Sequence, residues 1–382
     1  MIGNNFGNDF TYLYHALKAH PMLLKSCKLE EFDLLYEKLQ NQITDYNTLI
    51  DAMTMLTMFF EDGHTNIELP YTKEDACLRI SCEWNGEFLV LKEDYEEIKA
   101  GAKIIAVEGM KINGLHDHMA KLIPHENCYL VKSRMVEYPY KNYHVFSQMN
   151  LCKLFGNKQI YEITFCFKEA YFVKSCELVP YDGFLDFGQE KVFDYHIQES
   201  TLIFQLNECV YNDQYKAMLY EIAECCQRNA IDILEIDLSR NMGGSSAVID
   251  EFLKYVDIDS YRRYEMIDYS LGSPRYITRR TDLIQNKKRD IHFPAKIFCR
   301  VSNTTFSSAR TFAVTLKDNG IATIIGKPTG GKPNSYGMPR RDTTPILGIR
   351  FRVSQALFLR PDMKLDDEMS LYPDNDTMEK RK

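Results

Sequence analysis

Hydrophobic side chains recur with a helical period through the first part of the chain. In residues 8–60, apolar positions fall at i, i+3, i+4 and i+7, the spacing that places them on one face of a helix. The pattern predicts three helical segments: "FTYLYHALKAHPMLL", "EEFDLLYEKLQNQI" and "YNTLIDAMTMLTMFF". It stops at residues 61–70, "EDGHTNIELP", where turn residues gather ahead of a proline. We therefore expect an N-terminal helical region over residues 1–70.

The period then changes from helical to alternating. "CLRISCEWNGEFLVLKE" alternates on both sides of Asn85 and Gly86, which is a strong hairpin signal. "KQIYEITFCFKEAYFVKSCELV" is similarly rich in strand-forming residues, and residues 102–123 have the pattern of a strand, a turn, a second strand and a helix. Residues 71–195 are thus predicted to form a β-rich middle domain.

Strands and helices alternate from about residue 200 onward. Strand patterns such as "DILEIDLS" and "AKIFCRVS" are separated by helical ones such as "YKAMLYEIAECCQRN" and "SARTFAVTLKD". Such alternation predicts a parallel sheet with crossover helices. The length of 382 residues also exceeds the size of a single core, so we expect a separate α/β domain over residues 196–382.

Composition excludes several classes of protein. The net charge of −8 argues against a general nucleic-acid binder, which would carry a basic face. No membrane span is expected, because no run of about 18 apolar residues occurs, and the N-terminus has no signal-peptide pattern. The eleven cysteines form no C-x-x-C pair, so we expect reduced thiols and no zinc site. These features indicate a cytoplasmic protein, although a chain that had lost a signal peptide would have the same pattern.

Two serines stand where a predicted strand turns into a predicted helix, in "TTFSSAR", residues 304–310. Serine is a preferred helix cap, so capping alone would account for Ser307 and Ser308. A nucleophilic serine would occupy the same place, because a helix N-terminus stabilises negative charge and the next N–H can point at an oxyanion. Nucleophilic attack also requires a base, either a lysine or a histidine within hydrogen-bond reach.

Two other stretches offer partners for a nucleophile. "IDLSRNMGGSS" carries Gly243 and Gly244 in a turn, which either presents N–H groups to an oxyanion or is only a tight turn. His64 lies in the loop "EDGHTNIELP", where it could act as a base or be an ordinary turn residue.

A lysine-bearing loop, "IIGKPTGGKPNSYG", follows the strand after the serine's helix. Successive strand ends share one edge of a parallel sheet, so this loop is expected to come back beside Ser307. Lys332 would have to be buried to act as a neutral base, whereas we expect Lys327 to be solvated.

Taken together and in this order, these stretches resemble the carboxyl-terminal processing (tail-specific) serine proteases and their tricorn-core relatives. The matching pieces are "DGHT" at 62–65, "DLSRNMGG" at 237–244, "FSSA" at 306–309, "LKDNGIATIIGKPTGGK" at 316–332 and "RPD" or "YPD" near the end. The resemblance implies a ClpP/crotonase-like α/β catalytic core. It also places the β-rich domain where many relatives carry a PDZ domain, and "AGAKIIAVEGMKINGL" is similar to a PDZ segment.

The number of residues between the motifs assigns the site residues of this family to positions in the chain. In the processing proteases the base is a lysine 25 residues after the nucleophile, and Lys332 follows Ser307 by 25 residues (332 − 307). The resemblance therefore implies Ser307 as nucleophile and Lys332 as base, with the N–H groups of Gly243 and Ser308 as the oxyanion hole. In the tricorn-type branch, which "DGHT" resembles more, the base would instead be His64.

Several positions depart from the family pattern. Arg310 stands where relatives carry an acidic residue, Tyr336 where they often have glutamine, and Met242 where glycine is usual. In the tricorn-type branch a late carboxylate orients the histidine, and Asp367 or Glu368 would take that role here.

The resemblance implies a serine endopeptidase that cleaves peptides or protein tails through an acyl-enzyme on Ser307. Its partner would be a peptide or an unfolded protein, and it would need no metal and no organic cofactor. The departures support a second hypothesis, an inactive peptide-binding protein on the same scaffold. A third, a crotonase-type acyl-thioester enzyme, shares only the core and the oxyanion hole.

Overall fold

The computed structural model describes residues 2–184 and 191–374, and the chain divides into two compact units. Unit 1 consists of Met1–Gln189 and Pro339–Val353, and unit 2 consists of Glu190–Met338 and Ser354–Lys382. The predicted helical and β-rich regions thus share one unit, and a segment of the predicted α/β domain joins them. The division at residues 189–190 lies outside the described residues, and the predicted limits at 70 and 195 stay predictions.

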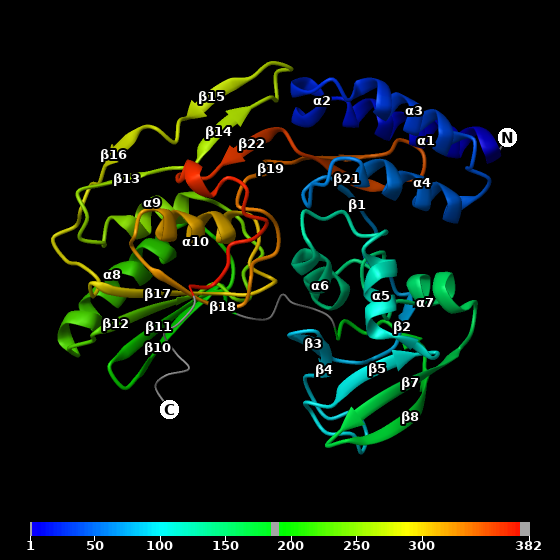
Figure 1. The fold of residues 1–382 in the computed structure, drawn as a ribbon, viewed down its shortest axis with the longest axis horizontal. Coiled ribbons are helices and arrows are strands. Elements are labelled where there is room, and N and C mark those ends of the chain that lie inside the picture. Colours follow the sequence, from blue (N-terminus) through cyan, green and yellow to red (C-terminus); the bar gives the residue numbers. More distant parts are fainter. Residues whose placement is uncertain (1, 185–190, 375–382) are drawn as a thin grey trace. The chain divides into compact units, whose positions relative to one another are not determined.

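Four helices form the first part of unit 1 (Figure 1): α1 (Ile2–Leu17), α2 (Pro21–Lys25), α3 (Leu29–Gln40) and α4 (Tyr46–Met58). The helical region is confirmed, but its first predicted segment is two helices. Pro21 has no backbone N–H with which to continue α1, so the chain breaks there and α2 starts with this proline. His20 caps α2 with its side chain, whose Nδ1 accepts the Met22 N–H at 3.1 Å.

A small antiparallel sheet covers these helices with strands from both ends of the sequence: β1 (Asn66–Glu68), β21 (Arg350–Val353) and β20 (Arg340–Thr343). Ile67 is paired with Phe351, and both side chains are buried in the same core as Leu13 and Leu56. The buried Asp9 accepts hydrogen bonds from Thr344 Oγ1 and from the N–H groups of residues 346 and 347. Residues 339–353 therefore belong to unit 1, and three of their apolar side chains, Ile349, Phe351 and Val353, are part of its core.

The β-rich part of unit 1 is built on one sheet in the order β3-β4-β5-β7-β8, with β6 paired to β5. Its strands are β3 (Cys82–Asn85), β4 (Phe88–Leu91), β5 (Lys103–Val107), β6 (Met110–Lys111), β7 (Ile160–Phe167) and β8 (Ala170–Glu177). The predicted hairpin is confirmed, since Asn85 is paired with Phe88 and Gly86 takes the positive φ of 62° that this turn requires.

Helices α5 (Ile112–Met119), α6 (Cys128–Glu137) and α7 (Gln148–Phe155), and the strand pair β2 (Ala76–Cys77) and β9 (Val179–Pro180), complete unit 1. Apolar side chains of the three helices and of the larger sheet form one core. The strand, turn, strand and helix predicted for residues 102–123 are present as β5, β6 and α5. The PDZ-like character of this part stays a prediction.

The main sheet of unit 2 has the order β10-β11-β12-β17-β18. Its strands are β10 (Phe193–Gln198), β11 (Thr201–Leu206), β12 (Ile233–Asp237), β17 (Lys296–Val301) and β18 (Thr323–Gly326), which lie side by side in Figure 1. All pairs except β10 with β11 are parallel. Helices α8 (Asp213–Arg228), α9 (Ala247–Leu253) and α10 (Ser308–Asp318) share its core, which confirms the predicted α/β alternation.

Antiparallel strands complete unit 2. The pair β13 (Ser260–Arg262) and β16 (Leu283–Gln285) stands apart from a sheet of four strands in the order β15 (Arg275–Thr278), β14 (Glu265–Asp268), β22 (Ala356–Leu359) and β19 (Ser335–Gly337). A short 3-10 helix, η1 (Met363–Leu365), follows β22. The structure thus has a mixed α/β unit with additional β-rich sheets and an N-terminal helical region, as expected; the narrower ClpP/crotonase-like likeness stays a prediction.

Candidate active site

The parallel register brings three loops of unit 2 to one edge of its main sheet. Asp237 at the end of β12 is paired with Arg300, and Val301 at the end of β17 is paired with Gly326. The glycine turn, the serine loop and the lysine loop therefore start from the same edge. A hydrogen bond of 2.7 Å from Asn303 Nδ2 to the Pro328 carbonyl ties the lysine loop to the serine loop, as the sequence predicts.

Ser307 precedes α10 in a backbone conformation that is rare for a residue with a side chain. Its φ is 53° and its ψ is −128°. Such strained positions persist only where the surroundings over-determine them, and they cluster at functional sites. The loop before it is held by the buried Thr305, whose Oγ1 donates to the Leu238 carbonyl at 2.7 Å, and by Phe306, whose N–H donates to the Asn241 carbonyl at 3.1 Å. The glycine loop thus fixes the backbone that leads into Ser307.

The glycine turn packs directly against this serine. A Cβ atom on Gly243 would lie 2.7 Å from Cβ of Ser307 and 3.1 Å from its Oγ. Gly243 and Gly244 both have positive φ values, 113° and 134°. Ser308 Oγ donates to the Gly244 carbonyl at 2.8 Å, so the hydroxyl of this second serine is engaged with the backbone. That bond commits the Ser308 hydroxyl to the backbone, which argues against Ser308 as the nucleophile.

The predicted oxyanion donors differ in their surroundings. The Gly243 N–H donates to Asn241 Oδ1 at 2.8 Å, and Asn241 is itself fully buried, with its Nδ2 bonded to the Leu206 carbonyl at 2.8 Å. To serve an oxyanion, this N–H would have to be shared with Asn241 Oδ1. The Ser308 N–H begins α10, where the helix dipole favours negative charge. The oxyanion role of both residues stays a prediction.

Lys332 and Arg310 also lie in unit 2. Lys332 is half-buried between the buried Gly331 and Pro333, in the loop from β18 to β19. Arg310, the departure from the acidic family residue, is buried and bonds Ser335 Oγ through Nη2, while its guanidinium lies 5.4 Å from the ring centre of Phe306. Arg310 therefore connects α10 to β19, which is a structural role.

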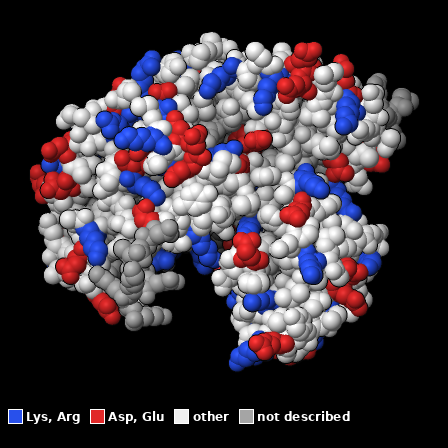
Figure 2. Space-filling model, in the orientation of Figure 1, with Lys and Arg blue, Asp and Glu red and all other residues white. Residues whose placement is uncertain are grey.

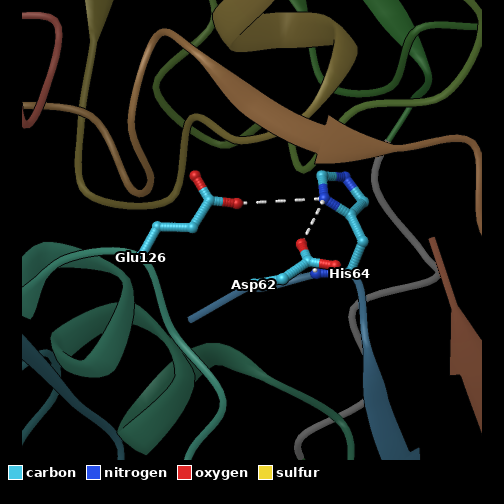
Figure 3. A group of neighbouring side chains, drawn as sticks. All are labelled: Asp62, His64 and Glu126. Carbon is cyan, nitrogen blue, oxygen red and sulfur yellow. Dashed lines mark hydrogen bonds and ion pairs between the residues drawn. The ribbon is translucent and has the colours of Figure 1, made fainter. Parts of the chain in front are cut away.

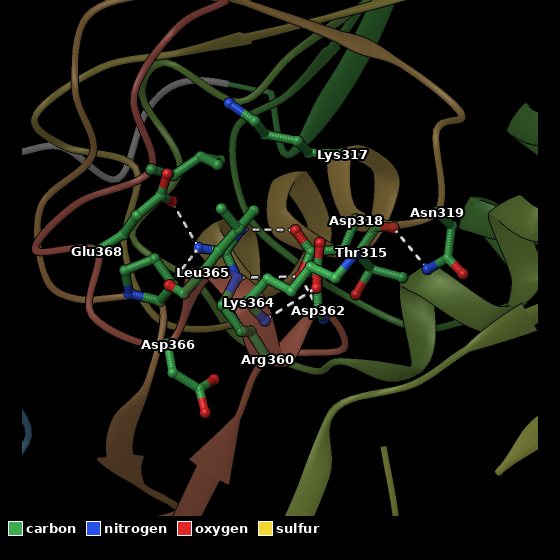
Figure 4. Close-up of polar contacts among 12 residues, drawn as sticks. Thr315, Lys317, Asp318, Asn319, Arg360, Asp362, Lys364, Leu365, Asp366 and Glu368 are labelled. Atoms are coloured by element: carbon green, nitrogen blue, oxygen red, sulfur yellow. Dashed lines mark hydrogen bonds and ion pairs between the residues drawn. The ribbon is translucent and has the colours of Figure 1, made fainter. Parts of the chain in front are cut away.

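The late carboxylates lie elsewhere in unit 2, around Arg360 of the "RPD" segment (Figure 4). Arg360 is fully buried and donates to Glu368 Oε2 at 2.5 Å and to both oxygens of Asp318 at 2.6 and 3.0 Å. Glu368 is thus engaged with an arginine, and Asp367 is exposed. Arg360 joins the end of α10 to the C-terminal segment, and the role of Asp367 or Glu368 in orienting a histidine stays a prediction without support from these contacts.

His64 lies in unit 1, in the turn between α4 and β1, and only 7% of it is exposed. Figure 3 shows two buried carboxylates, Asp62 and Glu126, facing the same ring nitrogen of this histidine. His64 Nδ1 lies 3.6 Å from Asp62 Oδ1 and 3.9 Å from Glu126 Oε1. A buried carboxylate next to Nδ1 is the arrangement that orients an imidazole and stabilises its protonated form during proton transfer.

Asp62 is fully buried and accepts several hydrogen bonds. They come from the His64 N–H at 2.9 Å, Thr65 Oγ1 at 2.6 Å and His20 Nε2 at 3.2 Å. Burial by itself raises the pKa of Asp62, but the hydrogen bonds from His20 and His64 outweigh it and hold this pKa well below its ordinary value. The carboxylate is therefore ionised at neutral pH.

The turn that carries His64 is also held from the β-rich part of unit 1. Arg134 is buried and donates to the Gly63 carbonyl and to the Pro124 carbonyl, each at 2.5 Å. Pro124 precedes Glu126 in the chain, so one arginine joins the two loops that meet at His64. One ligand atom from each of Asp62, His64 and Glu126 lies within 4.8 Å of the other two, and one imidazole with two carboxylates is also a donor set that a divalent metal could use.

Sequence reasoning found His64 but missed Asp62, His20 and Glu126. Asp62 stands inside the quoted "DGHT", where its spacing of two residues from the histidine was a usable signal. His20 and Glu126 gave no comparable signal, because they lie 44 and 62 residues away from His64 in sequence (64 − 20 and 126 − 64). Only the fold brings these side chains together.

The surface adds two observations. On the face drawn in Figure 2, basic and acidic side chains are interspersed, with no broad area of one sign. Within residues 2–184 and 191–374, no helix is long and apolar enough to cross a membrane.

Comparison with known proteins identifies the class. Residues 203–364 match the model of Peptidase family S41, and no curated protein sequence matches the chain significantly. The structure is similar to that of mature CPAF, with a TM-score of 0.68 and 14% identity over 97% of this chain and 92% of that one. It is also similar to the photosystem II D1 C-terminal processing protease, with a TM-score of 0.50 and 13% identity over 97% and 92%.

A putative peptidase from Parabacteroides merdae has the same fold at a TM-score of 0.50 and 12% identity, over 97% of this chain and 89% of that one. These likenesses show that the chain shares the fold of these proteins. The matched segment contains the glycine turn, Ser307 and Lys332. The match of residues 203–364 to Peptidase family S41 confirms the resemblance of this part of the chain to the C-terminal processing serine proteases.

Proposed function

We propose that this protein is a serine endopeptidase that cleaves peptides or protein tails through an acyl-enzyme on Ser307. The observation that carries the proposal is the strained Ser307 at the start of α10, packed against Gly243. A helix cap does not require a positive φ, and Ser307 makes no side-chain cap hydrogen bond to α10. The arrangement fits a nucleophile whose hydroxyl is held in place by a rigid turn.

In the proposed reaction Ser307 Oγ attacks the peptide carbonyl while a base removes its proton. The N–H of Ser308, with that of Gly243 shared from Asn241, stabilises the oxyanion that forms. The base then returns the proton to the leaving amine, and water, deprotonated by the same base, releases the acyl group from Ser307. Unfolded segments and chain ends suit such an enzyme, and C-terminal processing is the activity named for the D1 protease of similar fold.

The base is assigned to His64 in this proposal, with Lys332 as the alternative. The pairing of His64 with Ser307 follows from the resemblance to the tricorn-type branch, and the surroundings of His64 within unit 1 support it, because a buried ionised Asp62 lies beside its Nδ1. Lys332 matches the family spacing but is only half-buried, and a lysine acts as a base when burial keeps it neutral.

A fluorophosphonate probe tests the nucleophile directly. The wild-type chain is expected to be labelled on Ser307 and to cleave an unstructured peptide, and Ser307→Ala is expected to lose both while keeping its circular dichroism spectrum. Labelling that is lost in Ser308→Ala and kept in Ser307→Ala would transfer the role to the neighbouring serine. Peptide cleavage that continues in Ser307→Ala contradicts the proposal.

The engaged N–H of Gly243 favours one alternative, a peptide-binding protein that has lost catalysis. A hydrogen bond held by Asn241 leaves one donor fewer for an oxyanion, and losing one such donor costs about 100- to 1000-fold in rate. The same probe separates the two functions. A chain that binds unstructured peptide but is not labelled at Ser307 is the binding protein.

A further inference from the structure

We propose that His20 is a positioning residue for His64 and acts through Asp62. The proposal rests on the proposed function, in which His64 serves as the base. Two segments of unit 1 converge here: His20, which caps α2, and the "DGHT" turn, which carries Asp62 and, two positions later, His64. Asp62 and His20 are fully buried, which gives their contacts little freedom.

The two oxygens of Asp62 face different partners. Oδ2 lies 3.2 Å from His20 Nε2 and accepts the Thr65 hydroxyl at 2.6 Å. Oδ1 accepts the backbone N–H of His64 at 2.9 Å and lies 3.6 Å from Nδ1 of the same residue. His20 and Thr65 thus fix the plane of the carboxylate, and this plane determines where Oδ1 stands relative to the His64 ring.

The hydrogen bonds of His20 assign its tautomer. Nδ1 accepts the Met22 N–H at 3.1 Å, so the proton resides on Nε2, which donates to Asp62. Burial lowers the pKa of His20 more than Asp62 raises it, so this imidazole is neutral at pH 7. A neutral donor can hold the carboxylate in place without neutralising its charge.

The charge of Asp62 determines the tautomer of His64. Nδ1 faces Asp62 Oδ1 and Glu126 Oε1, both acceptors, so the proton of neutral His64 belongs on Nδ1 and Nε2 is left as the basic nitrogen. Arg134 also faces this turn, but it donates to the Gly63 carbonyl. Removing the His20 donor would let the carboxylate rotate, and the tautomer preference of His64 would weaken.

The competing explanation is that His20 only caps α2, and two substitutions separate the roles. In His20→Asn, the amide reaches the place of Nδ1, so the cap for Met22 is kept and the donor to Asp62 is lost. In His20→Gln, the longer amide reaches the place of Nε2, so the donor to Asp62 is kept. Both side chains are polar and smaller than or similar to the imidazole.

Steady-state kinetics of the full chain should then distinguish His20→Asn from His20→Gln. His20→Asn is expected to lower kcat by roughly 10- to 100-fold with KM unchanged, which is the range typical of outer residues that orient a functional side chain. His20→Gln is expected to restore most of the lost kcat. Equal losses in both variants, or a loss that follows thermal stability alone, would overturn the positioning role.

A second measurement does not depend on activity. The ¹⁵N chemical shifts of the His64 ring in Ser307→Ala report the tautomer, and we expect Nδ1–H to dominate there and to give way to a mixture when His20→Asn is added. An Nε2–H tautomer without that substitution overturns the proposal even if both His20 variants fail to fold. Titration with Zn²⁺ checks the ligand set; tight binding that requires Asp62, His64 and Glu126 would instead assign the group to a metal.

The two proposals fail in different ways. If the chain has no peptidase activity but His64 shows the expected tautomer and its dependence on His20, the positioning holds and the function does not. If peptides are cleaved but the tautomer does not respond to His20, the function holds and the positioning does not.

Discussion

Gly243 and Ser307 are in contact across two loops of unit 2, so close that a Cβ on the glycine would lie 2.7 Å from Cβ of the serine. Gly243→Ala should therefore displace Ser307 and strain the turn, whose φ of 113° disfavours a side chain. We expect kcat/KM to fall at least about 100-fold, since a misplacement of about 1 Å has that cost. Peptide cleavage measures the fall in kcat/KM. Gly272→Ala is the control for a side chain at positive φ, because a Cβ there would meet no atom within 4 Å.

Ser307 itself should store strain that glycine relieves. Its φ of 53° is a region that glycine occupies without cost, whereas alanine is as strained there as serine. We expect Ser307→Gly to unfold with a free energy about 1 kcal/mol higher than Ser307→Ala, although both are inactive. Urea denaturation of the two variants measures this difference, and an alanine variant of equal or greater stability would contradict the strain.

The base can be decided by two matched substitutions. If His64 removes the proton, His64→Gln loses at least about 100-fold in kcat and Lys332→Met stays close to the wild-type rate, because general base catalysis contributes about 100- to 10,000-fold. The reverse result assigns the base to Lys332. Lys327→Met is the control for the loss of one positive charge from this loop, since Lys327 is exposed.

The buried Asp62 should make stability depend on pH. Its pKa is held well below the ordinary 3.8, so its stabilising effect is fully present above that value and is lost as the pH falls toward the folded-state pKa. Asp62→Asn is expected to lower the free energy of unfolding by about 1.5–3 kcal/mol at pH 7, because buried donors lose hydrogen bonds to a charged acceptor. The difference in free energy of unfolding between Asp62→Asn and the wild type should become smaller below about pH 4, where the carboxylate of the wild type is increasingly protonated.

Denaturation at pH 7, 5 and 3 measures this difference. Asp117→Asn is the control, because its side chain is 79% exposed and lies 3.5 Å from the ring of a neighbouring histidine. A difference for Asp62→Asn that is constant over this range would show that the ionised carboxylate is not the source of the stability.

Arg360 should be worth far more to stability than a surface arginine. Arg360 and Asp318 are both fully buried partners, so Arg360→Met would leave an uncompensated buried carboxylate, at a cost of about 3–5 kcal/mol. Arg79→Met is the matched control, since the Arg79–Asp182 pair is largely exposed and should contribute at most about 1 kcal/mol. Thermal unfolding of both variants compares them, and similar losses would contradict the ranking.

The sequence predicted local structure well and distant contacts poorly. Period and turn signals located the hairpin at Gly86 and the strand–helix alternation of unit 2, because these depend on neighbours in the chain. The break at Pro21 was missed because the apolar period continues across it. The position of residues 339–353 in unit 1 could not be predicted, because any edge strand of suitable pattern could have paired with β1.

The same limit applied to the site. Ser307, Lys332 and Gly243 were named from motifs that are contiguous in sequence, and the structure gathers their loops at one sheet edge. Two contacts that bear on the roles of these residues were not visible in any motif. The Gly243 N–H donates to Asn241 Oδ1, and Arg310, which stands where relatives carry an acidic residue, bonds Ser335. Each depends on a side chain finding its partner through the fold.

The pairing of β1 with a strand from residues 350–353 has a consequence for synthesis on the ribosome. Residues 1–189 leave the ribosome first, but β1 receives its partner only when residues 350–353 have been made. The nascent chain must therefore carry an unpaired strand and an uncovered face of the α1–α4 core while nearly all of unit 2 is translated. A truncated chain that ends before residue 339 would retain this edge permanently, and it is the form of the protein most exposed to aggregation and to chaperones.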